Sequence, residues 1–315
     1  MKTNVRVILT LSEIWTMTDP RDLRRFMDYA RIAEDAGISG LMVGEHLAMG
    51  PSSNRNGAAL NPRDWVMAYN QPPNMPYPAS LPLLAAMAAA TSKIRLIAGA
   101  LLAPLRQPLI IAKELSTVDL LSRGRLVVLP TVSWQAEEYE ALGVDFRNRG
   151  KMLDEHLEIW KRLWTDGSPI SFDGDFYRFS NIHIEPSPHS PGGPTIWTGG
   201  KLFSPWMVRR VVAYGNGLFP IVPPSEEQFT ELDEAMKRAG RDMSELELVA
   251  QIPTPMFTDA TGLLDLDETL ANVPDLVAKG FTTLLLKPSM FIDDGAEFED
   301  FCRTAIRKIG KVVDA

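Results

Sequence analysis

His46 is the residue of this chain best suited to proton transfer. It is one of four histidines and directly follows a short apolar run at 41–43. An imidazole titrates near neutral pH and can give or take a proton at a reacting atom. A structural histidine bonded to a loop carbonyl is the alternative, but the position after a strand favours the proton role. Glu45 either orients the imidazole or forms an ion pair beneath the following loop, and both readings stay open.

A glycine pair followed by a lysine forms a candidate anion site. Gly199, Gly200 and Lys201 come just before a predicted helix. Backbone N–H groups at a helix start attract phosphate, and the lysine would add positive charge. A Gly-Gly pair is also ordinary turn chemistry, so the spacing alone does not decide. No His, Cys or Asp cluster has metal-ligand spacing, and we therefore expect no metal site.

A long loop at 47–79 is rich in Pro, Asn, Gly and Ser. Its aromatic and methionine residues include Trp65, Met67, Tyr69 and Tyr77. Loops of this length inside a domain are usually functional or disordered, and interleaved aromatic residues argue against disorder. We expect these side chains, together with Trp15 after the first strand, to wall a largely apolar substrate pocket. Contact between two copies of the loop across a dimer is the alternative.

The elements that must position these residues alternate between strand and helix. Continuous Val, Ile and Leu runs are typical of parallel strands that helices cover on both faces. The predicted strands lie at 5–11, 41–43, 94–102, a run ending at 129, 195–197, 217–222, 246–252 and 282–286. About eight strands, each followed by a helix, predict an α/β fold, the (β/α)8 TIM barrel, whose active site lies at the C-terminal strand ends. A doubly wound sheet is disfavoured, because no G-x-G-x-x-G turn follows the first strand.

Turn and cap residues set the remaining boundaries. Asp19 as N-cap and Gly37 as terminator predict a helix between them, and a single helix is predicted at about 267–279. Residues 168–185 alternate around the turn dipeptide Asp173-Gly174, which predicts a hairpin. We expect one domain over residues 1–315. Its insertions at the C-terminal face are the loop 47–79 and the hairpin with its Pro-rich extension, 168–194.

Composition narrows the class of protein. The net charge of −8 offers no basic excess for nucleic acid or a membrane surface. Cys302 is the single cysteine, which fits a reducing compartment and an inert buried thiol. No apolar stretch reaches the roughly 18 residues of a membrane span, and the N-terminal run is too short for a signal peptide. We expect a soluble cytoplasmic protein.

Several stretches together resemble one family. They are ATSKIRLIAGALLAPLRQPLIIAKELSTVDLLSRGRLVV, EEYEALGVDFRNRGKMLDEHLEIWKRLWT, PSPHSPGGPTIWTGG, VVAYGNGLFP and AMKRAGRD. These segments resemble the bacterial-luciferase-like superfamily of flavin- and deazaflavin-dependent oxidoreductases, and the resemblance covers nearly the whole chain. It implies a barrel with insertions, usually dimeric, and a flavin-type cofactor across the C-terminal face.

The resemblance also assigns roles to particular residues. Glu45-His46 matches the family's acid–His pair, with the histidine near the reactive ring edge. A non-proline cis peptide bond under the ring would fall at Gly99-Ala100 or Ala100-Leu101. The resemblance implies that further residues border the cofactor: Thr131, Ser133 and Trp134 along its edge, and Gly199, Gly200 and Lys201 at its phosphate.

The resemblance leaves the cofactor open between reduced FMN and the deazaflavin coenzyme F-420. The loop 129–134 is similar to that of some FMN monooxygenases, whereas later segments look more like deazaflavin members. Trp134 stands where sugar-phosphate dehydrogenases of the group keep a glutamate, which argues against such substrates. We expect a monooxygenase that uses reduced FMN, oxygen and possibly a separate flavin reductase on a small apolar molecule. A deazaflavin-dependent hydride transfer and a non-catalytic flavin-binding protein are the alternatives.

Overall fold

The computed structural model describes residues 5–65, 67–200 and 203–314. Eight parallel strands close into a barrel in the order β1-β10-β9-β8-β7-β4-β3-β2. The strands are β1 (Arg6–Thr10), β2 (Gly40–Val43), β3 (Arg95–Leu102), β4 (Leu126–Thr131), β7 (Thr195–Gly200), β8 (Gly217–Pro220), β9 (Glu247–Gln251) and β10 (Thr283–Leu286). The predicted (β/α)8 barrel is confirmed.

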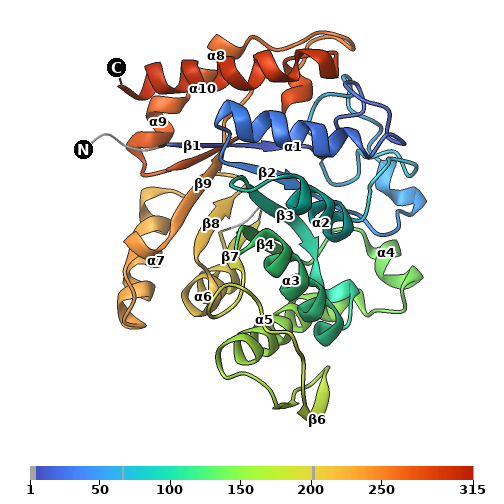
Figure 1. Cartoon of the computed structure of the whole chain (residues 1–315), viewed down its shortest axis with the longest axis vertical. Coiled ribbons are helices and arrows are strands. Elements are labelled where there is room, and N and C mark those ends of the chain that lie inside the picture. The colour runs from blue at the N-terminus through green and yellow to red at the C-terminus, as the bar shows by residue number, and fades with distance from the viewer. Residues whose placement is uncertain (1–4, 66, 201–202, 315) are drawn as a thin grey trace.

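Helices surround the strands, as Figure 1 shows. They are α1 (Arg25–Ala36), α2 (Ser80–Ala90), α3 (Pro108–Ser122), α4 (Ala136–Ala141), α5 (Arg149–Thr165), α6 (Pro205–Tyr214), α7 (Glu226–Arg238), α8 (Leu266–Leu270), α9 (Val273–Ala278) and α10 (Phe298–Asp314). The 3-10 turns are η1 (Pro51–Asn54), η2 (Ala103–Leu105), η3 (Phe146–Asn148), η4 (Met243–Glu245), η5 (Pro288–Met290) and η6 (Gly295–Glu297).

Two helix predictions were wrong, each for a local reason. The first helix begins at Arg25 rather than at Asp19, because the Asp19 carboxylate accepts a hydrogen bond from the Arg21 amide at 2.8 Å and closes a separate turn. The helix predicted at 267–279 is divided into α8 and α9. Pro274 lies in the first turn of α9, where the N–H group that proline lacks would have no helical partner. In the interior of one continuous helix the same proline would remove a hydrogen bond and break the helix.

Other turn predictions are confirmed. Gly37 ends α1 in the left-handed region at φ 89°, where a side chain would be disfavoured. The predicted hairpin is the antiparallel pair β5 (Ile170–Asp173) and β6 (Arg178–Ile182). It projects beyond α5 at the bottom of Figure 1.

Apolar side chains fill the barrel on both faces of its strands. The interior holds Ile8, Met42, Ile97, Val127, Leu129, Trp197, Phe219, Val249 and Leu285. A larger cluster lies between the strands and the surrounding helices. Because both faces are covered, the strands read as uninterrupted apolar runs. Polar residues at the C-terminal ends of the strands are therefore the candidates for an active site.

Candidate active site

A cavity of about 260 Å³ opens at the C-terminal ends of the strands. His46, after β2, lies in its wall, and Gly99 and Ala100 of β3 lie in its floor. The peptide bond between Gly99 and Ala100 is cis, at the first of the two positions that the family resemblance implied. The pairing of β3 with β4 shifts register at this point.

A second cavity of about 420 Å³ adjoins the first, and both are lined by Ala100 and Ile221. The sequence-predicted residues that it brings together are Thr131, Ser133, Trp134, Gly199 and Gly200. Lys201, the last of the predicted cofactor residues, lies outside the described part of the chain. Ser204 and Arg210 of the α6 region also line this cavity, and the sequence reasoning did not select them.

Glu138 holds the imidazole of His46. The Nδ1 atom of His46 lies 3.1 Å from Oε2 of Glu138. This carboxylate also accepts hydrogen bonds from the amides of Leu47 (2.5 Å) and Ala48 (3.2 Å) and from the Ser133 hydroxyl (3.1 Å). Burial alone would raise the pKa of Glu138, but the hydrogen bonds and the charge of His46 outweigh it and lower the pKa. Such a carboxylate fixes the tautomer with the proton on Nδ1.

Glu45 is engaged by groups other than the His46 imidazole. Its carboxylate pairs with both terminal nitrogens of Arg106, at 2.7 and 2.9 Å. It also accepts from the Ser80 hydroxyl (2.6 Å) and the Leu102 amide (3.1 Å). Of the two readings of Glu45, these contacts fit the ion pair, here with Arg106. Glu138 takes the orienting role.

Aromatic rings enclose the imidazole from the sides. The His46 ring meets the rings of Tyr77 and Trp134 edge-on, with centroids 5.1 and 5.7 Å away. Tyr69 packs against the far side of Trp134 at 4.9 Å and is not part of the cavity wall. Rings in this arrangement pack favourably and exclude water from the polar group between them.

Of the five residues expected in a substrate pocket, the cavity wall contains Trp65, Met67 and Tyr77. Trp15 lies instead against Phe26 of α1, with ring centroids 6.1 Å apart, where it covers the core.

A buried polar group joins the predicted pocket residue Tyr77 to two charged side chains beside the cavity. The Tyr77 hydroxyl donates to Glu13 at 2.6 Å, and Nζ of Lys287 lies 3.6 Å from the other oxygen of Glu13. Lys287 also donates to the Asp64 carbonyl at 3.0 Å. Burial raises the pKa of Tyr77 and lowers that of Lys287, with Glu13 raising both.

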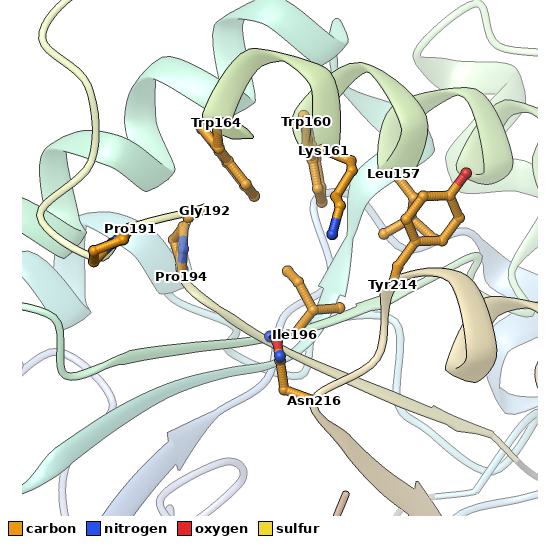
Figure 2. A pocket seen from close by; sticks show the side chains of 11 residues that line it. Leu157, Trp160, Lys161, Trp164, Pro191, Gly192, Pro194, Ile196, Tyr214 and Asn216 are labelled. Atoms are coloured by element: carbon orange, nitrogen blue, oxygen red, sulfur yellow. Dashed lines mark hydrogen bonds between the residues drawn. The ribbon is translucent and has the colours of Figure 1, made fainter. Parts of the chain in front are cut away.

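A third cavity, of about 190 Å³, lies at the other end of the barrel. Figure 2 shows Trp160, Lys161 and Trp164 of α5 projecting toward Ile196 and Asn216. Ile196 is near the start of β7, and Asn216 immediately precedes β8. Because barrel chemistry takes place at the C-terminal strand ends, we exclude this cavity from the candidate site.

In the part of the chain that the structure describes, no three His, Cys, Asp or Glu side chains are gathered as metal ligands. Nor is any helix of these residues long and apolar enough to cross a membrane. Cys302 is buried in α10, and burial raises the pKa of its thiol to about 12.

This chain belongs to the luciferase-like monooxygenase family, whose model matches residues 6–260. An FMNH(2)-dependent dimethylsulfone monooxygenase from Pseudomonas fluorescens is 36% identical over 119 residues. That match covers 37% of this chain and 32% of the relative, so it spans about a third of the relative's length.

Solved structures share the fold at low sequence identity. The long-chain alkane monooxygenase LadA superposes with a TM-score of 0.73 at 13% identity, over 99% of this chain and 92% of that one. The coenzyme F420 dependent tetrahydromethanopterin reductase from Methanopyrus kandleri has a TM-score of 0.69 at 15% identity, covering 97% and 99%. At these identities the likeness concerns the fold alone.

Proposed function

We propose that this protein is a flavin-dependent monooxygenase that uses reduced FMN and oxygen on a small, largely apolar organic molecule. The observation that carries the proposal is the His46–Glu138 pair at the wall of a cavity whose floor is Gly99-Ala100. Membership of the luciferase-like monooxygenase family and the FMNH(2)-dependent relative support it.

The two adjoining cavities fit a flavin nucleotide. Glycine at position 44 leaves room above the floor, because a Cβ there would lie 3.1 Å from the Gly99 carbonyl oxygen. In the second cavity, Arg210 is held by Asp154 (2.6 Å) and the Gly150 carbonyl (2.8 Å). This guanidinium and the start of α6 suit a phosphate. We infer that the ring would lie over Gly99-Ala100 and the phosphate near Arg210.

The residues around the bound cofactor would then have separate roles in proton exchange and in the exclusion of water. Reduced FMN supplies two electrons, so that one oxygen atom enters the substrate and the other leaves as water. Because Nδ1 of His46 is engaged by Glu138, Nε2 is the nitrogen that can exchange a proton with a bound molecule. The rings of Tyr77 and Trp134 keep water away from that exchange.

A deazaflavin-dependent hydride transfer is the second candidate. The reductase from Methanopyrus kandleri has the same fold, which supports this reading at the level of the fold. We further propose that residues 1–315 form one cytoplasmic domain that works as a homodimer, with reduced flavin supplied by a separate reductase. A non-catalytic flavin-binding protein is the remaining alternative.

Oxygen uptake tests the proposal. Purified protein is given reduced FMN or reduced coenzyme F-420 with a panel of small neutral compounds, and uptake is corrected for peroxide with catalase. We expect substrate-dependent uptake with reduced FMN alone. Uptake that is fully recovered as peroxide for every compound would remove the monooxygenase reading. Tight FMN binding without turnover on any compound would favour the non-catalytic one.

A further inference from the structure

We propose that the substrate of this site is uncharged, and that Glu13 and Lys287 determine this specificity. The inference rests on the proposed function, with the substrate placed over the flavin ring in the part of the cavity beside His46. It concerns the charge that this cavity presents to a bound molecule.

Among the described residues, each acid or base in the wall of this cavity is already paired within the protein. Its ionisable members are Glu13, Glu45, His46 and the phenol of Tyr77. Glu45 is matched by Arg106 through two contacts, at 2.7 and 2.9 Å. His46 is matched by Glu138 at 3.1 Å. Each internal pair leaves little charge for a ligand to meet.

Glu13 is the carboxylate that could give the cavity a negative charge, since its side chain is 10% exposed. Both of its oxygens are engaged, one by the Tyr77 hydroxyl at 2.6 Å and the other by Nζ of Lys287 at 3.6 Å. A cationic substrate group would therefore compete with Lys287 for the same oxygen. In a cavity of low dielectric that competition is costly.

Binding of an anionic substrate group in this cavity would also be unfavourable. No lysine or arginine belongs to the wall of this cavity among the residues that the structure describes. A sulfonate or carboxylate would lose its water without gaining a counter-ion, and it would approach Glu13. The rest of the wall is largely apolar, with Met42, Leu129, Phe219 and Leu285.

Lys287 donates to the Asp64 carbonyl at 3.0 Å and lies 3.6 Å from Glu13, and the second of these contacts is the one that uses its charge. Its side chain is fully buried, and a buried ion pair is weak evidence for stability because an apolar pair often does as well. The position of Lys287 beside Glu13 explains its positive charge better. Lys287 offsets the charge of Glu13, so that Glu13 can anchor the Tyr77 ring beside His46 while the cavity stays neutral.

Binding of matched probes tests this inference without turnover. Dimethyl sulfone and methanesulfonate have the same number of heavy atoms around a tetrahedral sulfur, and benzyl alcohol, benzoate and benzylammonium share one ring. Dissociation constants are measured by ligand-observed NMR on the protein with oxidised FMN. We expect each neutral probe to bind at least about tenfold more tightly than its ions. An ion that binds as tightly as its neutral partner, or failure of both neutral probes to bind, overturns the inference.

Two variants assign the specificity to the named pair. Lys287→Met exposes the charge of Glu13 and should shrink the preference for benzyl alcohol over benzylammonium at least about threefold. Glu13→Gln removes the carboxylate and should shrink the preference over benzoate. Lys308→Met, which removes an exposed ion pair with Asp267 on the outer surface, is the control. Wild-type ratios in every folded variant would contradict the role of the pair. These binding measurements require no oxygen. Failure of the monooxygenase proposal in the oxygen-uptake assay is therefore distinguishable from failure of the charge-specificity inference.

Discussion

At the scale of single residues, the site depends on how one imidazole is held. Glu138 engages one nitrogen of His46, and the rings of Tyr77 and Trp134 fix the plane of the imidazole. The second nitrogen is not the one that Glu138 engages, and His46 lines the cavity. A proton-transfer group needs this combination of a fixed tautomer and one free position.

Replacing the imidazole tests the proton role. His46→Ala should lower kcat for the oxygenation by about 10²–10⁴-fold, the usual contribution of a positioned acid or base. Steady-state kcat and KM are the measurement. His183→Ala is the matched control, because His183 is exposed in the hairpin region, and it should leave both values unchanged. Equal kcat in wild type and His46→Ala would remove His46 from the chemistry.

The Glu138 carboxylate should contribute to the pH dependence of the free energy of unfolding in acid. Its pKa is lowered in the folded protein, so its ionised form stabilises the fold above the unfolded value near 4.5. That contribution is lost as the pH falls below 4.5 through the lowered folded pKa. Denaturant unfolding of Glu138→Gln at pH 3 to 6 should therefore show a shallower loss of stability on acidification than wild type. Parallel curves for the two proteins would contradict this assignment.

At the scale of elements, the loop 47–79 is fastened across the mouth of the barrel. The amide of Asn61 donates to the carbonyls of Gly262 (2.9 Å) and Asp259 (3.3 Å) in the loop after β9. Arg63 forms an ion pair with Asp293. The loop thereby brings Trp65, Met67 and Tyr77 to the cavity wall.

Removing one fastening should loosen this loop. Asn61→Ala deletes two hydrogen bonds that contribute about 0.5–1.5 kcal/mol each. We expect faster amide hydrogen exchange within 56–70 and faster release of bound FMN. Asn148→Ala, whose amide bonds only Asp145 in an exposed turn, is the control. The idea fails if exchange in the loop is the same in both variants.

Sequence patterns predict the elements better than the contacts between them. The strands and Gly37 follow from local composition, because apolar runs and a left-handed glycine are set within a few residues. The start of α1 was misplaced, since an aspartate caps a turn as readily as a helix. Glu138 was missed because it is 92 residues from His46 and only the fold brings them together. Gly99, Ala100 and the loop 131–134 came from family resemblance rather than from periodicity.

At the scale of the whole molecule, an ion-pair network closes the end of the barrel opposite the site. Glu247, at the start of β9, accepts two hydrogen bonds from Arg95 of β3 at 2.7 and 2.8 Å. It also accepts from Thr283 of β10 and, at 3.1 Å, from Arg6 of β1. The indole N–H of Trp197 in β7 donates to the same carboxylate at 3.3 Å, so that one carboxylate joins five strands of the barrel.

This network should govern the acid stability of the fold. Burial raises the pKa of Glu247, but Arg95, Thr283 and Arg6 lower it to about 2. Its contribution of about 3 kcal/mol is present above pH 4.5 and is lost as the pH falls from 4.5 to 2. Glu247→Gln should lower the free energy of unfolding at pH 7 and flatten its dependence on pH below 4.5. An unchanged pH dependence in Glu247→Gln would show that this network does not determine the acid stability of the fold.

The anaerobic affinities of reduced FMN and reduced coenzyme F-420 test the central claim most directly. Titration of each reduced cofactor into the purified protein, followed by fluorescence or absorbance, gives two dissociation constants under the same conditions. The proposed FMN monooxygenase should bind reduced FMN at least about tenfold more tightly than the reduced deazaflavin. Tighter binding of the reduced deazaflavin would contradict the claim and establish the hydride-transfer reading in its place.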